Sequence, residues 1–143
     1  MNKDLKKACS ILAAQGCTCV LCKEEAVYTS TARGVRPLVE FLDSGVDFHG
    51  FSAADKVIGK ATAFLYCLLG VKEVYAQVIS RSALQILEGH GIAAGYDILT
   101  DAIFNHRKDG FCPMETATKN ISDPQEALAA IRRTMEILRA KNS

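Results

Sequence analysis

Charged side chains gather at the start of a long apolar stretch, SAADKVIGKATAFLYCLLG, which covers residues 52–70. We interpret this stretch as one buried helix, with Ser52 as its N-cap and Gly70 as its C-cap. The charges near its beginning belong to Asp55, Lys56 and Lys60. The two lysines would lie one helical turn apart and point the same way. Amines at the start of a helix oppose its dipole, so they indicate a site for an anionic ligand.

These charges have a structural alternative, an exposed ion pair of the kind that contributes little to stability. A further cation, Arg81, follows Ser80 at the start of the next predicted helix. Two consecutive helix starts with basic side chains would suit a phosphate or carboxylate at the carboxyl edge of a parallel sheet. The alternative for Arg81 is a solvent-exposed side chain. Neither GxGxxG nor GxxxxGK occurs, so no glycine-rich phosphate loop is predicted.

A second polar cluster covers residues 105–115, NHRKDGFCPME. As a functional loop it would close over the start of helix 52–70, where Arg107 would bind the anion. The other lid residues beside the ligand would be Asn105, Cys112 and Glu115. As a plain connector the segment would be solvated, with Phe111 and Met114 in the core.

The six cysteines and three histidines form no metal-ligand pattern. The segment CTCVLC holds three cysteines, and an extended strand would point Cys17 and Cys19 to one face and Cys22 to the other. The histidines are scattered, and HExxH is absent. We therefore predict buried free thiols, no metal and no cofactor.

Hydrophobic periodicity and turn residues predict an α/β fold that positions these groups. We expect helices at 3–15, 37–42, 52–70, 81–88 and 124–141, strands at 17–22, 26–30, 71–80 and 92–99, and a short extended segment at 46–51. A polar turn between the first two strands predicts a hairpin. The alternation of elements that follows is typical of parallel βαβ units, and it leaves the strand order open.

Length and charge indicate one globular domain, residues 1–143, with a net charge of +1. This charge gives no broad electrostatic case for nucleic acid or an anionic membrane as partner. The N-terminal residues MNKDLKKACS contain no apolar signal-peptide core, and the longest apolar run is too short to span a bilayer. We expect a cytoplasmic protein with reduced thiols.

Three stretches together resemble an uncharacterised prokaryotic family of unknown function that has a cytidine-deaminase-like fold. They are RGVRPLVEFL, AADKVIGKATAFLYCLLGVKEVYAQVIS and FNHRKDGFCPMET, and the likeness extends over about residues 3–135. The resemblance implies a three-layer α-β-α sandwich. Its mixed five-stranded sheet would combine the N-terminal antiparallel hairpin with parallel βαβ units.

The comparison with zinc deaminases fails at the residues that would bind the metal. Those enzymes place a His or Cys, then a Glu two residues later, at the first helix start, and Pro-Cys-x-x-Cys at the second. Here the two positions read Ala54–Asp55–Lys56 and Ile79–Ser80–Arg81. Cys112–Pro113 lies beyond the third of the parallel strands and has no second cysteine after it. The resemblance therefore implies a deaminase-shaped pocket without zinc chemistry.

Three functional hypotheses follow. The first is a metal-free domain that binds a small anionic or nucleotide-like ligand, with Asp55, Lys56, Lys60, Ser80 and Arg81 below it and Asn105, Arg107, Cys112 and Glu115 above. The second is an enzyme with non-zinc chemistry, for which a desolvated Lys56 or Lys60, Cys112 as nucleophile, or Glu115 are the catalytic candidates. The third is a structural homo-oligomer with a degenerate pocket, in which Phe48 and Phe51 are either contacts or core residues.

Overall fold

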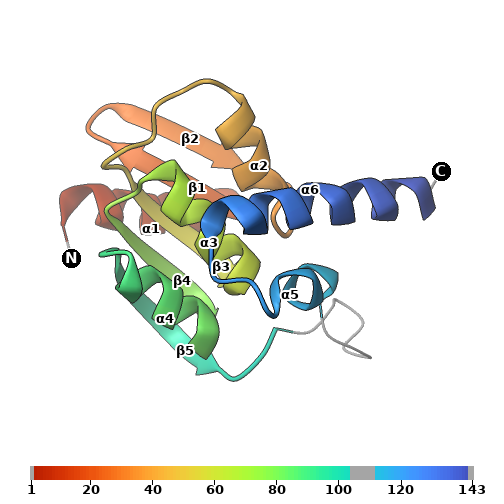
Figure 1. Cartoon of the computed structure of the whole chain (residues 1–143). Helices are drawn as coiled ribbons and strands as arrows, with labels where there is room; N and C mark the ends of the chain where they lie inside the picture. Colours follow the sequence, from red (N-terminus) through yellow and green to blue (C-terminus); the bar gives the residue numbers. More distant parts are fainter. Residues whose placement is uncertain (1, 104–111, 142–143) are drawn as a thin grey trace.

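The computed structural model describes residues 2–103 and 112–141, which form a mixed five-stranded sheet with helices on both faces (Figure 1). Its strands are β1 (Cys19–Lys23), β2 (Ala26–Ser30), β3 (Ser52–Ile58), β4 (Glu73–Ser80) and β5 (Ala93–Thr100). Its helices are α1 (Lys3–Gln15), α2 (Arg36–Asp43), α3 (Lys60–Leu69), α4 (Arg81–Gly89), α5 (Pro113–Thr118) and α6 (Pro124–Lys141). No helix in these ranges is long and apolar enough to cross a membrane.

The strands lie in the order β2-β1-β3-β4-β5. The hairpin strand β1 runs antiparallel to both β2 and β3, and the βαβ strands β3, β4 and β5 are parallel to one another. This arrangement confirms the predicted mixed sheet of a hairpin plus parallel units. It also places β3 at the centre, where both faces of the sheet can be covered.

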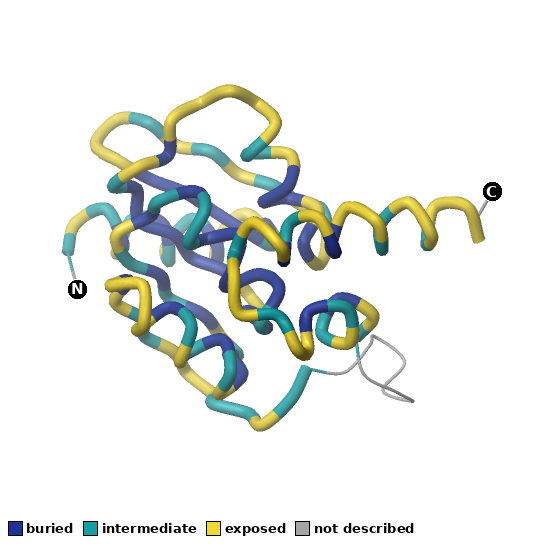
Figure 2. The backbone as a smooth tube through the Cα atoms, viewed as in Figure 1, coloured by how far each residue is buried: buried dark blue, intermediate teal, exposed yellow. Residues whose placement is uncertain are grey.

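Two separate apolar clusters hold the layers together. Beneath α1 lies a small cluster made by Ala8, Leu12, Cys17, Val20, Cys22 and Ala54. On the other face, α2, α3 and α4 cover a much larger core, and α5 and α6 pack against α3 (Figures 1 and 2). Both clusters share β1 and β3, so these two strands carry the sheet's most buried residues.

The predicted helix over residues 52–70 is wrong in its first half. Residues 52–58 form strand β3, Gly59 follows, and the helix begins only at Lys60. The apolar positions of SAADKVI fit a central strand as well as a helix, and β1 and β4 supply hydrogen-bonding partners on both sides. Ser52 caps nothing, because its hydroxyl donates to Glu73 Oε2 at 3.0 Å. Gly70 does end the helix in the left-handed conformation, with φ 77°.

The extended segment predicted at 46–51 contains no strand. Its two phenylalanines, Phe48 and Phe51, are buried in an aromatic cluster with Tyr28 and Phe41. They are therefore core residues and form no exposed contact surface. The prediction that Cys17 and Cys19 share a face of the first strand is wrong. The strand begins only at Cys19, so its alternation does not extend to Cys17, which shares a cluster with Cys22.

Candidate functional site

Two helices begin where the parallel strands β3 and β4 end, which is the edge where open α/β sheets bind ligands. The helix α3 starts after Gly59, which has no side chain to cap it. The helix α4 starts after Ser80, whose hydroxyl accepts a hydrogen bond from Ala83 N at 3.2 Å. The first amide groups of α3 therefore need an acceptor from elsewhere, whereas α4 carries its own cap.

Glu115 of α5 supplies the acceptor for α3. Its Oε1 lies 3.4 Å from Ala61 N, and the amide of Lys60 also donates to this carboxylate. The group is partly buried, and burial raises its pKa against the opposing effect of these two amides and of the Lys60 charge. A negative group is thus already bound at the start of α3, where the helix dipole favours it.

Gly59 makes this contact sterically feasible. A Cβ at position 59 would overlap the Glu115 carboxylate and would also come within 3.2 Å of Ile103 Cγ1. Beside it, Lys60 donates from Nζ to Lys119 O at 2.8 Å and lies 5.9 Å from the centroid of the Phe64 ring. The arrangement combines the Lys60 amine, helix amides that already bind a carboxylate, and a position without a side chain at Gly59. These features suit the binding of a carboxylate or phosphate.

Arg81 and Ser80 occupy the adjacent helix start. Ser80 is fully buried as the cap of α4, and its Oγ lies 3.3 Å from Ser82 Oγ. Arg81 is exposed and donates from Nε to Asp101 Oδ1 at 2.7 Å. An exposed ion pair of this kind contributes little to stability. The exposed side chain of Arg81 agrees with the structural alternative given for it above.

Asp55 lies in a different environment from the one predicted. It is buried within β3, and its Oδ2 accepts a hydrogen bond from Tyr66 Oη at 2.7 Å. Cys19 Sγ lies 3.2 Å from the same Tyr66 oxygen. Burial raises the pKa of Asp55 to about 7, although Tyr66 and the amides of Val57 and Lys56 oppose the shift. This hydrogen-bonded trio is enclosed in the core, so Asp55 does not cap a helix.

Lys56 points away from this trio. Successive strand residues face opposite sides of a sheet, and Lys56 is exposed where Asp55 is buried. The structure therefore does not bring Asp55, Lys56 and Lys60 together as one floor. Only Lys60 of these three stands at the start of a helix.

The predicted lid is described in part. Asn105 and Arg107 lie outside the described residues. Cys112 is partly exposed and stands at the N-cap position of α5, where its amide donates to Ile103 O at 3.2 Å. Met114 is buried, as the connector interpretation predicted for this residue.

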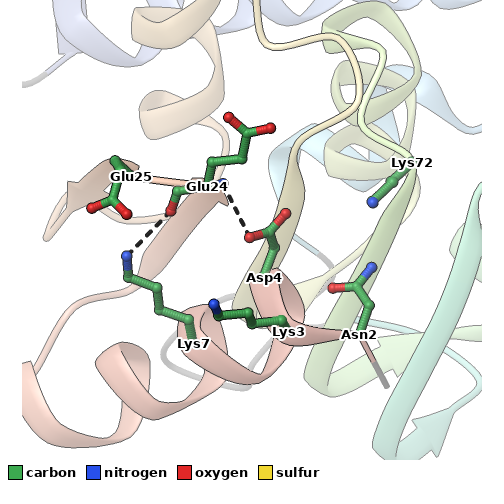
Figure 3. A pocket seen from close by; sticks show the side chains of 7 residues that line it. All are labelled: Asn2, Lys3, Asp4, Lys7, Glu24, Glu25 and Lys72. Atoms are coloured by element: carbon green, nitrogen blue, oxygen red, sulfur yellow. Dashed lines mark hydrogen bonds between the residues drawn. The ribbon is translucent and has the colours of Figure 1, made fainter.

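Two surface hollows lie elsewhere. The larger, about 490 Å³, is lined by side chains of α1, the β1–β2 turn and Lys72 (Figure 3). In it Lys7 donates to Glu24 O at 3.3 Å, and Glu24 N donates to Asp4 Oδ1 at 3.0 Å. The second, about 310 Å³, lies where α3 and α4 end, and His49 and His90 line it. Neither hollow includes a predicted site residue.

The part of the chain that the structure describes contains no group of three or more His, Cys, Asp or Glu side chains that could hold a metal ion.

Sequence reasoning missed Gly59, Tyr66 and Cys19 as partners of the predicted residues. The glycine inside ADKVIGKA was a signal, because a glycine there suggests close backbone approach. The aspartate that follows two alanines in SAADK was another, because a buried carboxyl needs a donor.

A family model described as "TM1506: Domain of unknown function (DUF1893)" matches residues 7–135. The chain is also similar to a solved structure, that of a DUF1893 family protein (TM1506) from Thermotoga maritima. The two share 23% sequence identity with a TM-score of 0.85, over 93% of this chain and 91% of that one. At this identity the likeness concerns the fold. No curated protein matches the chain.

Proposed function

Because this chain belongs to the TM1506 family, a domain of unknown function (DUF1893), we propose a function from its site: metal-free binding of a small anionic or nucleotide-like molecule at the start of α3. The observation that carries the proposal is the Glu115 carboxylate on the amides of Lys60 and Ala61. A carboxylate in that position indicates that the site tolerates negative charge. The cytidine-deaminase-like resemblance supports the nucleotide-like part of the proposal.

The ligand would replace the internal carboxylate. Burial disfavours the charged form of Glu115, so its charge is only weakly stabilised there. A phosphate offers more acceptor oxygens and more charge than a carboxylate, and Lys60 could turn from the Lys119 carbonyl to meet it. Arg81 and Ser80 stand at the next helix start. Cys112 stays a predicted lid residue, and the other two, Asn105 and Arg107, lie outside the described residues. Asp55 and Lys56 have no role in this version of the site.

Thermal unfolding in the presence of inorganic phosphate, AMP and glucose 6-phosphate tests the proposal. A ligand at 100 times its Kd stabilises the folded state by about 2.7 kcal/mol, which raises the Tm by roughly 5–10 °C for a chain of this size. We expect Glu115→Gln to strengthen binding several-fold because the competing charge is gone. Lys60→Ala should weaken it by a similar factor.

Glu126→Gln is the matched control, since Glu126 is exposed in the first turn of α6. It should leave the ligand-induced shift unchanged. If no probe stabilises the wild type or Glu115→Gln, or if Lys60→Ala leaves the shift intact, anion binding at α3 is wrong.

A further inference from the structure

In the part of the chain that the structure describes, one side of the β5 backbone has no neighbouring strand. The strand lies at the end of the sheet, and among the described residues its only strand partner is β4. It is eight residues long, whereas β2 at the opposite end of the sheet has five. Natural proteins use charged side chains, above all lysine, and proline to block edge-to-edge association. The sequence AAGYDILT contains no lysine, arginine or proline, and Asp97 is its one charged residue.

An apolar row reaches this edge across the sheet. Val57, Val78 and Ile98 are in register on β3, β4 and β5, so they point to the same face. Val57 is 44% exposed and Ile98 58% exposed, and none of the residues of β5 is fully buried (Figure 2). Tyr96 adds a further exposed ring on the same strand. The edge therefore combines free backbone groups with apolar side chains. Such an edge suits an extended apolar strand as its binding partner.

We propose that β5 is the interface between two copies of this chain, which pair antiparallel along β5 around a two-fold axis. Two identical strands that pair antiparallel around a two-fold axis form a self-complementary contact. If one residue of the first copy lies opposite a given residue of the second copy, the same two positions also meet with the copies exchanged. With Tyr96 on the axis, Ala94 lies opposite Ile98 of the second copy. In the same register Gly95 lies opposite Asp97, so no carboxylate opposes its own copy.

Size complementarity favours β5 of a second copy, and not an unrelated strand, as the partner. On either side of Tyr96, residues 93–95 are small and residues 97–99 are larger, so an antiparallel copy centred on Tyr96 places larger side chains against small ones. Because Gly95 has no side chain, the Tyr75 ring packs directly over it, and a Cβ at position 95 would lie 2.8 Å from Tyr75 Cδ2. The resulting sheet would be continuous over ten strands.

The area of such a contact sets its strength. An eight-residue strand is about 26 Å long. Two copies that pair only along this edge would together bury no more than roughly 1,200 Å² of surface, which is the lower limit for stable interfaces. We therefore expect a reversible dimer whose population rises with protein concentration. This inference does not depend on the proposed anion site.

Sedimentation velocity of the purified full chain between 1 and 500 µM tests the proposal. The mass should rise from 15.5 kDa toward twice that value over this range. Ile98→Lys places a charge beside the edge and should weaken association at least tenfold, with an unchanged circular dichroism spectrum. Ile137→Lys is the control, since Ile137 is 55% exposed but lies on α6.

Hydrogen exchange gives a second readout. Amides of β5 should become more protected as concentration rises, while those of the other edge strand, β2, should not. A monomer at every concentration overturns the proposal. It is equally overturned if Ile98→Lys leaves the dimer intact, if Ile137→Lys weakens it as much, or if the added protection appears away from β5.

Discussion

At the scale of single residues, Asp55 is a carboxyl group buried in the core. Its carboxyl lies in the sheet with the Tyr66 hydroxyl 2.7 Å away, and burial raises its pKa from 3.8 to about 7. The folded protein therefore binds a proton that the unfolded chain releases above about pH 4. Folding is coupled to protonation at this one side chain.

We predict that the free energy of unfolding falls as the pH rises from about 4 to about 7, by roughly 2–4 kcal/mol. The sign follows from the raised pKa, since the native state binds more protons than the unfolded state in this range. Urea unfolding at a series of pH values measures it. Asp55→Asn should flatten the curve, because the amide cannot titrate.

Glu115 contributes with the same sign, because burial raises its pKa as well. Glu115→Gln therefore serves as the control and should remove only a smaller part of the slope. An Asp55→Asn protein that keeps the full pH dependence would show that another group is responsible.

Residue types alone placed Lys60 in the second turn of a helix starting at Ser52 and Glu115 in a lid above it, whereas the structure has both at the start of α3. The sequence shows an aspartate one position before a lysine, which is equally compatible with a helix cap and with a strand that alternates between core and solvent. The choice depends on Tyr66, eleven residues later, whose hydroxyl faces the carboxyl only after α3 packs on the sheet. Such a contact has no local signature.

At the scale of elements, the contact between α3 and α5 depends on Gly59. We predict that Gly59→Ala destabilises the protein by about 1–3 kcal/mol, because the new methyl group overlaps the Glu115 carboxylate. Chemical unfolding measures the loss. In a Glu115→Ala background the same substitution should cost clearly less, although Ile103 still limits the space.

A cost that is the same in both backgrounds would mean that Gly59 matters for its backbone and not for this contact. The double-mutant cycle separates the two explanations, since it isolates the coupling between the two side chains.

The elements with strong local signals were predicted closely. The helix α1 has the predicted bounds of 3–15, and α6 begins after Asp123, whose Oδ2 accepts from Glu126 N at 3.0 Å. The strand β3 was missed because its apolar residues do not alternate strictly, as expected for a strand covered on both faces. The short helix α5 was missed because it follows a dense polar segment without periodicity.

At the scale of the whole molecule, the class of fold was predictable and the order of strands was not. A hairpin followed by βαβ units restricts the sheet to a mixed one. The position of β1 between β2 and β3 depends on pairing between residues 30 to 36 positions apart in the sequence. Pairs such as Cys19 with Asp55 leave no trace in periodicity.

The three thiols in and just before β1 lie in different layers of the molecule. Cys17 and Cys22 lie in the cluster under α1, whereas Cys19 lies in the main core beside Tyr66, and all three are free and buried. Alkylation kinetics followed by mass spectrometry can therefore time the opening of each layer separately. If α1 detaches as an independent cooperative unit, Cys17 and Cys22 should be modified before Cys19; equal rates for all three would indicate that the molecule opens as one body.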